Sequence, residues 1–190
     1  MRSFARQTAI VGIGATEFSK NSGRSELQLA GEAVLAAIAD AGLLPSDVDG
    51  LTTFTMETNS EIEVARTAGL GDLTFFSKIG YGGGAACATV QQASIAVATG
   101  VADTVVCYRA FNERSGHRFG SGAVRGEPTA EGIAMGWVSA FGLMTPASWV
   151  AMFAQRYLHE YGATSADFGL VSVADRKHAA TNPKAWFYEQ

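Results

Sequence analysis

Residues 85–99 (AACATVQQASIAVAT) constrain the fold more than any other stretch, because they read as a helix that carries no charged side chain. A helix that is apolar or small on every side packs inside a protein. Gly100 ends the predicted helix, and residues 102–108 (ADTVVCY) follow as a β-branched strand. The stretch therefore predicts a buried helix that leads directly into a sheet, a pattern typical of α/β folds.

The preceding residues alternate in the same way between strands and helices. A short apolar segment that ends in glycines opens the chain, and Ser25 with Gln28 forms a capping-box pattern ahead of a helix that Gly42 stops. Strands joined through helices form a largely parallel sheet with right-handed crossovers. We therefore predict a βαβαβαβ core with strands over 8–14, 50–55, 73–79 and 102–108, and helices over 29–41, 61–70 and 85–99.

The character of the chain changes after Asn112. Residues 113–131 are rich in glycine and arginine without a clear period, and residues 132–154 carry no charge. The second stretch is long enough to cross a bilayer, but two glycines and the pair Thr145-Pro146 interrupt it. We interpret it as an apolar loop that lines a pocket and ends where Thr145 and Pro146 start a new helix.

These changes divide the chain into three predicted parts. Residues 1–112 form the α/β core, and residues 113–163 form an inserted loop region with a helix. Residues 164–190 form a final helix and an end that looks cut before a second half. A second capping box, residues 164–167 (TSAD), starts this helix, which we expect to end near residue 180.

Composition and short motifs exclude several classes of protein. The net charge is −4 and the basic residues form no dense run, which argues against a nucleic-acid partner. Cys87 and Cys107 form neither a disulfide framework nor a metal-ligand spacing, and residues 1–6 do not start a signal peptide. Residues 12–14 do not open a dinucleotide fingerprint, because Glu17 occupies the third glycine position. We expect a cytoplasmic protein without a metal site or a membrane span.

Three segments together resemble the thiolase superfamily, nearest to its sterol-carrier-protein and lipid-transfer-protein branch. Residues 10–18 (IVGIGATEF) resemble the opening strand of that branch, and residues 85–106 resemble its nucleophile-bearing helix and following strand. Residues 161–183, which end in DRKHAATNP, resemble a third segment of the branch. Because members have two similar halves, the resemblance implies the amino-terminal half of a thiolase-like α/β fold with layered helices.

The resemblance also reveals a departure at the start of the buried helix. The nucleophilic cysteine of the family falls on Gly83, within residues 81–84 (YGGG). A glycine cannot form a thioester, but the backbone N–H groups at Gly83 and Gly84 remain available to an anion. A glycine at this place resembles the lipid-transfer-protein aldolases of steroid (cholesterol) side-chain degradation. Their retro-aldol cleavage of a β-hydroxyacyl-CoA implies a ketone and a shorter acyl-CoA, such as propionyl-CoA, as products here.

The resemblance implies where the substrate binds, with coenzyme A as part of the substrate and no covalently bound cofactor. The catalytic base is expected in the other half. The CoA-binding loop of the family corresponds to Arg114, His117, Arg118 and Arg125. These side chains either meet CoA phosphates or belong to a solvated polar loop. Apolar residues that either line an acyl or steroid pocket or form ordinary core are Trp137, Phe141 and Met144.

Two protein partners follow from the same resemblance. In the family, the third strand pairs across a two-fold axis in a homodimer, which covers its edge. The corresponding residues are Phe75, Phe76, Ile79 and Tyr81. The aldolases also work with a small partner of the DUF35 type, which carries an OB-fold and a zinc ribbon.

Two other functions stay open on the sequence alone. Cys87 lies one helical turn after Gly83 and is either the displaced nucleophile of a thiolase or a small buried residue. Cys107 is expected in the core. The apolar stretch 132–154 alternatively indicates an acyl-CoA or lipid carrier, or a structural subunit, without enzymatic activity.

Overall fold

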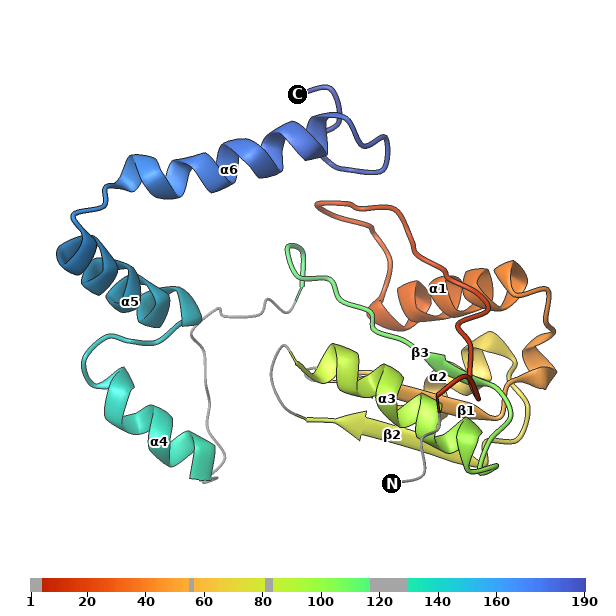
Figure 1. Cartoon of the computed structure of the whole chain (residues 1–190). Coiled ribbons are helices and arrows are strands. Elements are labelled where there is room, and N and C mark those ends of the chain that lie inside the picture. The colour runs from red at the N-terminus through yellow and green to blue at the C-terminus, as the bar shows by residue number, and fades with distance from the viewer. Residues whose placement is uncertain (1–4, 55–56, 81–83, 117–129) are drawn as a thin grey trace. The chain divides into compact units, whose positions relative to one another are not determined.

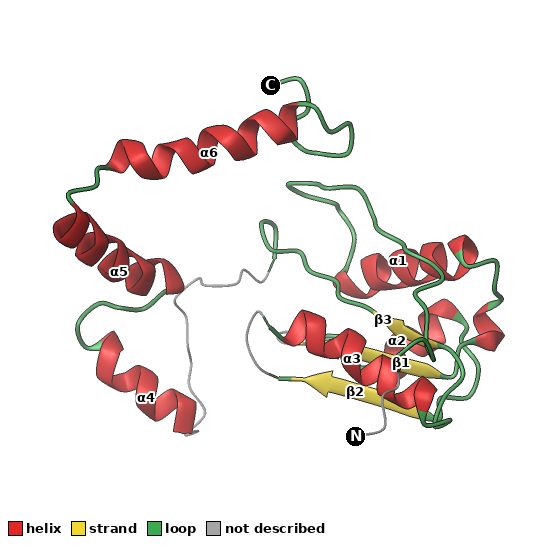
Figure 2. Cartoon of the chain, viewed as in Figure 1, coloured by secondary structure: helices red, strands yellow, loops and turns green. Residues whose placement is uncertain are grey.

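A parallel sheet organises the first part of the chain (Figures 1 and 2). In this computed structural model the described residues are 5–54, 57–80, 84–116 and 130–190. They fall into two compact units, Met1–Gly116 and His117–Gln190, which we describe separately. The first unit contains α1 (Glu26–Asp40), the short 3-10 helix η1 (Pro45–Asp47), β1 (Gly50–Phe54), α2 (Glu61–Ala68), β2 (Phe75–Ile79), α3 (Ala85–Ala98) and β3 (Val105–Cys107).

The strand order among the described residues is β2-β1-β3, and both pairings are parallel. Gly50 is in register with Phe75 on one side and with Val105 on the other. The three strands therefore end at one common edge, which we call the carboxyl edge of the sheet. The predicted parallel sheet, from its second strand onward, is confirmed.

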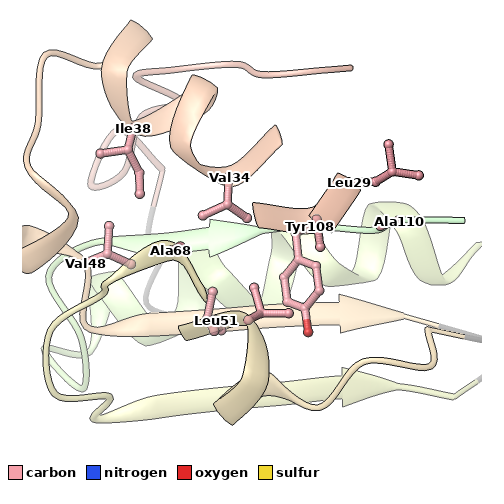
Figure 3. Packing of buried hydrophobic residues seen from close by; sticks show 10 residues of the cluster. Leu29, Val34, Ile38, Val48, Leu51, Ala68, Tyr108 and Ala110 are labelled. Carbon is pink, nitrogen blue, oxygen red and sulfur yellow. The ribbon is translucent and has the colours of Figure 1, made fainter. Parts of the chain in front are cut away.

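The two faces of the sheet carry different helices. Leu51 and its β3 neighbour Val106 face a core that α1 and α2 complete, whereas α3 packs along the opposite face (Figure 3). Successive strand residues point to opposite faces, so one register decides which side chains enter the core. The side chains at the centre of this core are Leu29, Val34, Ile38, Val48, Leu51, Val64, Ala68, Tyr108 and Ala110.

Local capping explains where the helices start. Ser25 Oγ accepts a hydrogen bond from the Gln28 backbone N–H at 3.1 Å, as predicted. The second bond of a capping box would join the Ser25 backbone N–H to the Gln28 side chain. This bond is absent from the contacts described for Gln28, and the side-chain amide donates to Glu32 instead. Ser60 and Glu63 form a complete capping box at the start of α2, which the sequence analysis did not identify. Each cap satisfies backbone donors that the first helical turn leaves unpaired.

The predicted strand over residues 8–14 is wrong. These residues form no strand, and the glycines bring the backbone against α1 instead. A Cβ atom at Gly14 would lie 2.3 Å from the Ala33 carbonyl oxygen, and one at Gly12 would lie 2.3 Å from the Ala37 carbonyl oxygen. The backbone N–H of Ile13 donates to Asp40 at 2.9 Å. The segment is therefore held by a helix rather than by a sheet ladder.

The prediction that α3 is buried on every side is also wrong for this chain. Its covered residues Ala85, Thr89, Ala93 and Ala96 form one stripe along the sheet. Val90 is 41% exposed on another side, because no described residue of the first unit covers that side of the helix. The absence of charge therefore identified α3 correctly as a helix but not the extent of its burial.

The second unit contains α4 (Ala130–Ser139), α5 (Pro146–Tyr161) and α6 (Ser165–Ala180). The capping signals at Thr145-Pro146 and at residues 164–167 are confirmed as the starts of α5 and α6. The predicted apolar loop is wrong in its first part, where α4 forms. Gly136 lies within this helix, which ends at Ser139, and the chain turns at Gly142, whose φ is +80°. Among the described residues, no helix has the length and apolarity needed to cross a membrane.

Candidate functional site

The carboxyl edge of the sheet is the candidate site, because strands β1 and β2 end there and α3 begins there (Figure 1). In open parallel sheets, ligands bind outside the carboxyl ends of the strands. Gly84 is the N-cap of α3, and a Cβ atom added to it would meet no heavy atom within 4 Å. Among the described residues, no atom therefore crowds the start of α3 on this side, and the first turn of a helix has backbone N–H groups without an intrahelical partner. Gly83 itself lies outside the described residues.

Glu57 lies at the same edge, shortly after β1, and only 2% of it is exposed. Its carboxylate accepts hydrogen bonds from the backbone N–H of Ala110 at 2.8 Å and of Asn59 at 3.1 Å. Its carbonyl oxygen accepts from Lys78 Nζ at 2.5 Å. The sequence analysis missed Glu57, because its partners on β2 and after β3 are distant along the chain and leave no local pattern.

Arg109 follows β3 and lies between two aromatic rings. Its guanidinium carbon is 4.9 Å from the centroid of the Phe54 ring and 4.7 Å from that of the Phe111 ring. Such contacts orient a cation without neutralising it. The side chain is exposed at the edge and was likewise not identified from the sequence.

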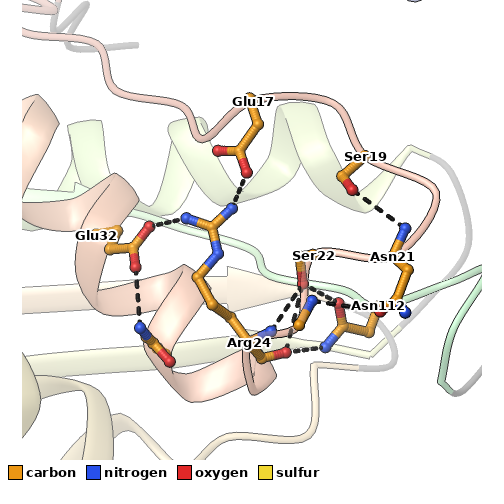
Figure 4. Close-up of polar contacts among 9 residues, drawn as sticks. Glu17, Ser19, Asn21, Ser22, Arg24, Glu32 and Asn112 are labelled. Carbon is orange, nitrogen blue, oxygen red and sulfur yellow. Dashed lines mark hydrogen bonds and ion pairs between the residues drawn. The ribbon is translucent and has the colours of Figure 1, made fainter.

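A polar hollow of about 380 Å³ lies beside Arg109. Asn112 fixes one wall of it: its side chain donates to the Arg24 carbonyl oxygen at 2.7 Å and accepts from Ser22 Oγ at 3.0 Å (Figure 4). Arg24 forms ion pairs with Glu17 and Glu32, which hold the opposite wall against α1. The hollow is lined by residues 14–19, Ser22, Leu29, Ala33 and residues 109–115.

Of the residues predicted to contact CoA, Arg114 lines this hollow. His117, Arg118 and Arg125 lie outside the described residues. The predicted pocket residues belong to the second unit and are exposed there: Trp137 by 76%, Phe141 by 82% and Met144 by 48%. The hollow thus contains one of the predicted residues and adds Arg109 and Asn112.

Three of the four predicted dimer residues lie on β2, which is an edge strand in the described sheet. Phe75 and Ile79 are half-buried, and Phe76 is 62% exposed on the face that carries Leu51. Tyr81 lies outside the described residues.

Both cysteines are exposed. From the sequence, Cys107 was expected in the core, and a small buried residue was one of two interpretations of Cys87. Cys87 is exposed on α3, because it lies off the stripe that contacts the sheet. Cys107 is the last residue of β3, where the strand leaves the sheet, and is also exposed. Its thiol lies 3.9 Å from the Thr89 carbonyl oxygen, and partial burial against α3 raises the pKa of this thiol. Among the described residues, no three His, Cys, Asp or Glu side chains gather in a way that could hold a metal ion.

Two buried hydroxyl groups, Tyr108 OH and Thr52 Oγ1, have no hydrogen-bond partner among the residues that the structure describes. Burial raises the pKa of Tyr108, and the charges of Glu57 and Glu61 raise it further. Tyr108 is therefore a neutral phenol at physiological pH.

Replacing Tyr108 by phenylalanine is expected to raise the free energy of unfolding by about 1 kcal/mol, because an unpaired buried hydroxyl is costly. Urea denaturation of the two proteins measures the difference. Thr52→Val is the matched control, since it removes the second unpaired oxygen from the same region. A loss of stability in Tyr108→Phe would contradict the assignment and would mean that the phenol has a partner.

A parallel α/β unit with a helix that begins at the carboxyl edge of its sheet occurs in many classes of enzyme, and comparisons with known proteins identify the class of this chain. No family model matches the chain. It is 72% identical over 184 residues to a steroid side-chain-cleaving aldolase of Thermomonospora curvata, covering 96% of this chain and 47% of that protein. It is 71% identical over 184 residues to a 17-hydroxy-3-oxo-4-pregnene-20-carboxyl-CoA lyase of Mycobacterium tuberculosis, with 96% and 48% covered.

A solved structure of an Ltp2–ChsH2 (DUF35) aldolase matches with a TM-score of 0.86 and 71% identity, covering 96% of this chain and 46% of that one. The chain therefore spans about half the length of the relatives it matches. It belongs to the lipid-transfer-protein branch of the thiolase superfamily, in the group that includes these aldolases. The resemblance and the fold class inferred from the sequence are thus confirmed.

Proposed function

We propose that the protein to which this chain contributes is a carbon–carbon lyase that cleaves a steroid side-chain β-hydroxyacyl-CoA by a retro-aldol reaction. The observation that carries the proposal is the glycine start of α3 in a chain that is 71–72% identical to proteins named as an aldolase and a lyase. Without a nucleophile at that position, acyl transfer through an enzyme-bound thioester has no anchor there.

The proposed reaction needs a base and an anion site. The base takes the proton of the β-hydroxyl, the O–H electron pair forms the ketone, and the Cα–Cβ pair moves onto the thioester as an enolate. Protonation of that enolate at Cα releases a shorter acyl-CoA such as propionyl-CoA. Open N–H groups at the start of α3, near Gly83 and Gly84, are suited to hold the enolate oxygen. Removing one such donor typically costs ~3 kcal/mol of transition-state stabilisation. We place the base in the other half of the protein.

Substrate binding follows from the polar hollow beside Arg109. We propose that Arg114 meets the phosphates of CoA at this hollow, since guanidinium groups bind phosphate through charge-assisted hydrogen bonds. The proposed CoA contacts also include His117, Arg118 and Arg125, which lie outside the described residues. We propose that Trp137, Phe141 and Met144 contact the apolar acyl part, because such large exposed side chains favour an apolar ligand or cover.

The proposed assembly has two further chains. A second copy pairs with the β2 edge, where Phe76 is exposed, since an open parallel edge needs a cover. A small DUF35-type protein completes the complex, as the name of the matching aldolase structure indicates for that protein. We propose a cytoplasmic location, where acyl-CoA substrates are formed.

The test uses the full-length protein with its partner and a double variant, Cys87→Ser with Cys107→Ser. The variant is expected to keep kcat within about threefold of the unmodified protein, because no thiol takes part in a retro-aldol cleavage. Mass spectrometry of the products should find a ketone and a shorter acyl-CoA. A thiolase that uses Cys87 would instead lose its activity in the variant and carry an acyl group on Cys87 in the unmodified protein. Binding of acyl-CoA without turnover would favour a carrier.

A further inference from the structure

Glu57 connects the ends of all three strands at the carboxyl edge. It lies shortly after β1, its carbonyl oxygen accepts a hydrogen bond from Lys78 of β2, and its carboxylate accepts one from the backbone N–H of Ala110 after β3. Thr53 Oγ1 adds a bond of 2.7 Å to the Tyr108 carbonyl oxygen in the same layer. Strand β3 ends at Cys107, so these side-chain contacts continue the link between β1 and the β3 segment beyond the end of the strand.

The contacts require a carboxylate and not merely a polar side chain. The donors at Glu57 are the backbone N–H groups of Ala110 and Asn59 and the side-chain amide of Asn59, and all of them need an acceptor. An ionised carboxylate accepts at both oxygens, whereas the amide of glutamine turns an NH₂ group toward one of the donors. Glutamine has nearly the same volume, so Glu57→Gln removes the contacts at one oxygen without opening a cavity.

The two segments that Glu57 joins are the two sides of the candidate site. Lys78 lies near the end of β2, and Gly84 at the start of α3 follows it shortly along the chain. Ala110 lies between Arg109 and Phe111, which line the polar hollow. Loss of either bond lets one side shift relative to the other. A shift of about 1 Å in the position of reacting groups can reduce a rate by roughly 100-fold.

We propose that Glu57 is a positioning residue of the lyase site, which holds the start of α3 and the Arg109 segment at a fixed separation. The inference rests on the proposed function, because it concerns the same site. Glu57 acts through the backbone of its neighbours and touches no reacting atom. Because the reacting groups need the tightest alignment, its contribution is expected chiefly in kcat. The Arg109 segment also lines the hollow proposed for CoA, so KM should change as well, but by less.

The experiment measures kcat and KM for Glu57→Gln in the full-length complex. We expect kcat to fall about 10- to 100-fold, while KM stays within about threefold. Lys78→Met is the second variant, which removes the ammonium donor to the Glu57 carbonyl oxygen. Its kcat should fall about tenfold, and the double variant should be no slower than Glu57→Gln, because both substitutions release the same connection. Lys78→Met also keeps the test decisive if Glu57→Gln does not fold.

Asp49→Asn is the matched control. Asp49 lies before β1, at the opposite edge of the sheet, and its carboxylate also accepts from backbone N–H groups, those of Asp103 at 2.9 Å and Thr104 at 2.9 Å. The control should lower the melting temperature as Glu57→Gln does, yet keep kcat within about twofold because it lies away from the site. An equal loss of kcat in both variants, or none in Glu57→Gln, would overturn the proposal. Failure of the unmodified complex to cleave the carbon–carbon bond would instead reject the proposed function.

Discussion

Replacing Leu51 by alanine is expected to lower the free energy of unfolding by about 3 kcal/mol, one of the largest single-site effects in this chain. Leu51 is fully buried in the central strand, between the side chains of α1 and α2. Truncation to alanine loses the free energy gained by burying the methyl groups of Leu51. It also leaves a cavity, because the closely packed neighbouring elements cannot move in to fill it. Urea denaturation followed by circular dichroism measures the shift in midpoint at constant slope.

The matched control is Leu44→Ala, because Leu44 is 65% exposed on the loop before η1. An exposed position of this kind is expected to change stability by no more than about 0.5 kcal/mol. A loss below about 1 kcal/mol in Leu51→Ala would place Leu51 outside a well-packed core and would contradict the assigned register of β1.

Five helices of this chain, α1, α2, α3, α5 and α6, could be predicted from sequence because their signals are local, whereas α4 lies where part of a loop was predicted. Ser25 and Thr145 each precede a helix and accept a backbone N–H within the first turn, and the backbone N–H of Thr164 donates to the Asp167 carboxylate at the start of α6. Such caps depend only on residues three or four positions away, so a linear pattern contains all the necessary information. The parallel sheet followed from the alternation of strands and helices, since a crossover helix forces neighbouring strands to run in the same direction.

Features that depend on distant partners could not be predicted in the same way. Residues 8–14 have the composition of a strand, but whether an apolar segment joins a ladder depends on a free strand edge beside it. Burial of α3 and of Cys87 depends on what covers the helix, and composition does not specify the cover. The sequence pattern therefore identified element types more reliably than their surroundings.

The candidate site shows the same division. Gly84 was predicted from the resemblance and lies at the open start of α3, and Arg114 lies at the polar hollow. Glu57 and Arg109 were missed, because their contacts join positions after β1 with positions after β3. A buried acid in a short polar segment looks like any surface acid until its partners are known.

Replacing Gly14 by alanine is expected to release the amino-terminal segment from α1. The added Cβ would lie 2.3 Å from the Ala33 carbonyl oxygen and 2.4 Å from the Ala37 nitrogen. Both atoms belong to the helix backbone, so neither can move aside as a flexible side chain would. Overpacking of this kind costs about 1–3 kcal/mol, and the loss should appear as local opening of the segment.

Trypsin cleavage after Lys20 measures that opening, because the segment from Gly14 to Ser22 forms one wall of the polar hollow. A local cost of about 1–2 kcal/mol should raise the cleavage rate roughly 5- to 30-fold in the regime where opening is fast compared with cleavage. Gly169→Ala adds the same carbon in α6, where it meets no heavy atom within 4 Å, and should leave cleavage at Lys20 unchanged. Equal cleavage rates in Gly14→Ala and the unmodified protein would mean that the segment does not pack against α1. The close approach of the amino-terminal backbone to α1 would then not explain why Gly12 and Gly14 are glycines.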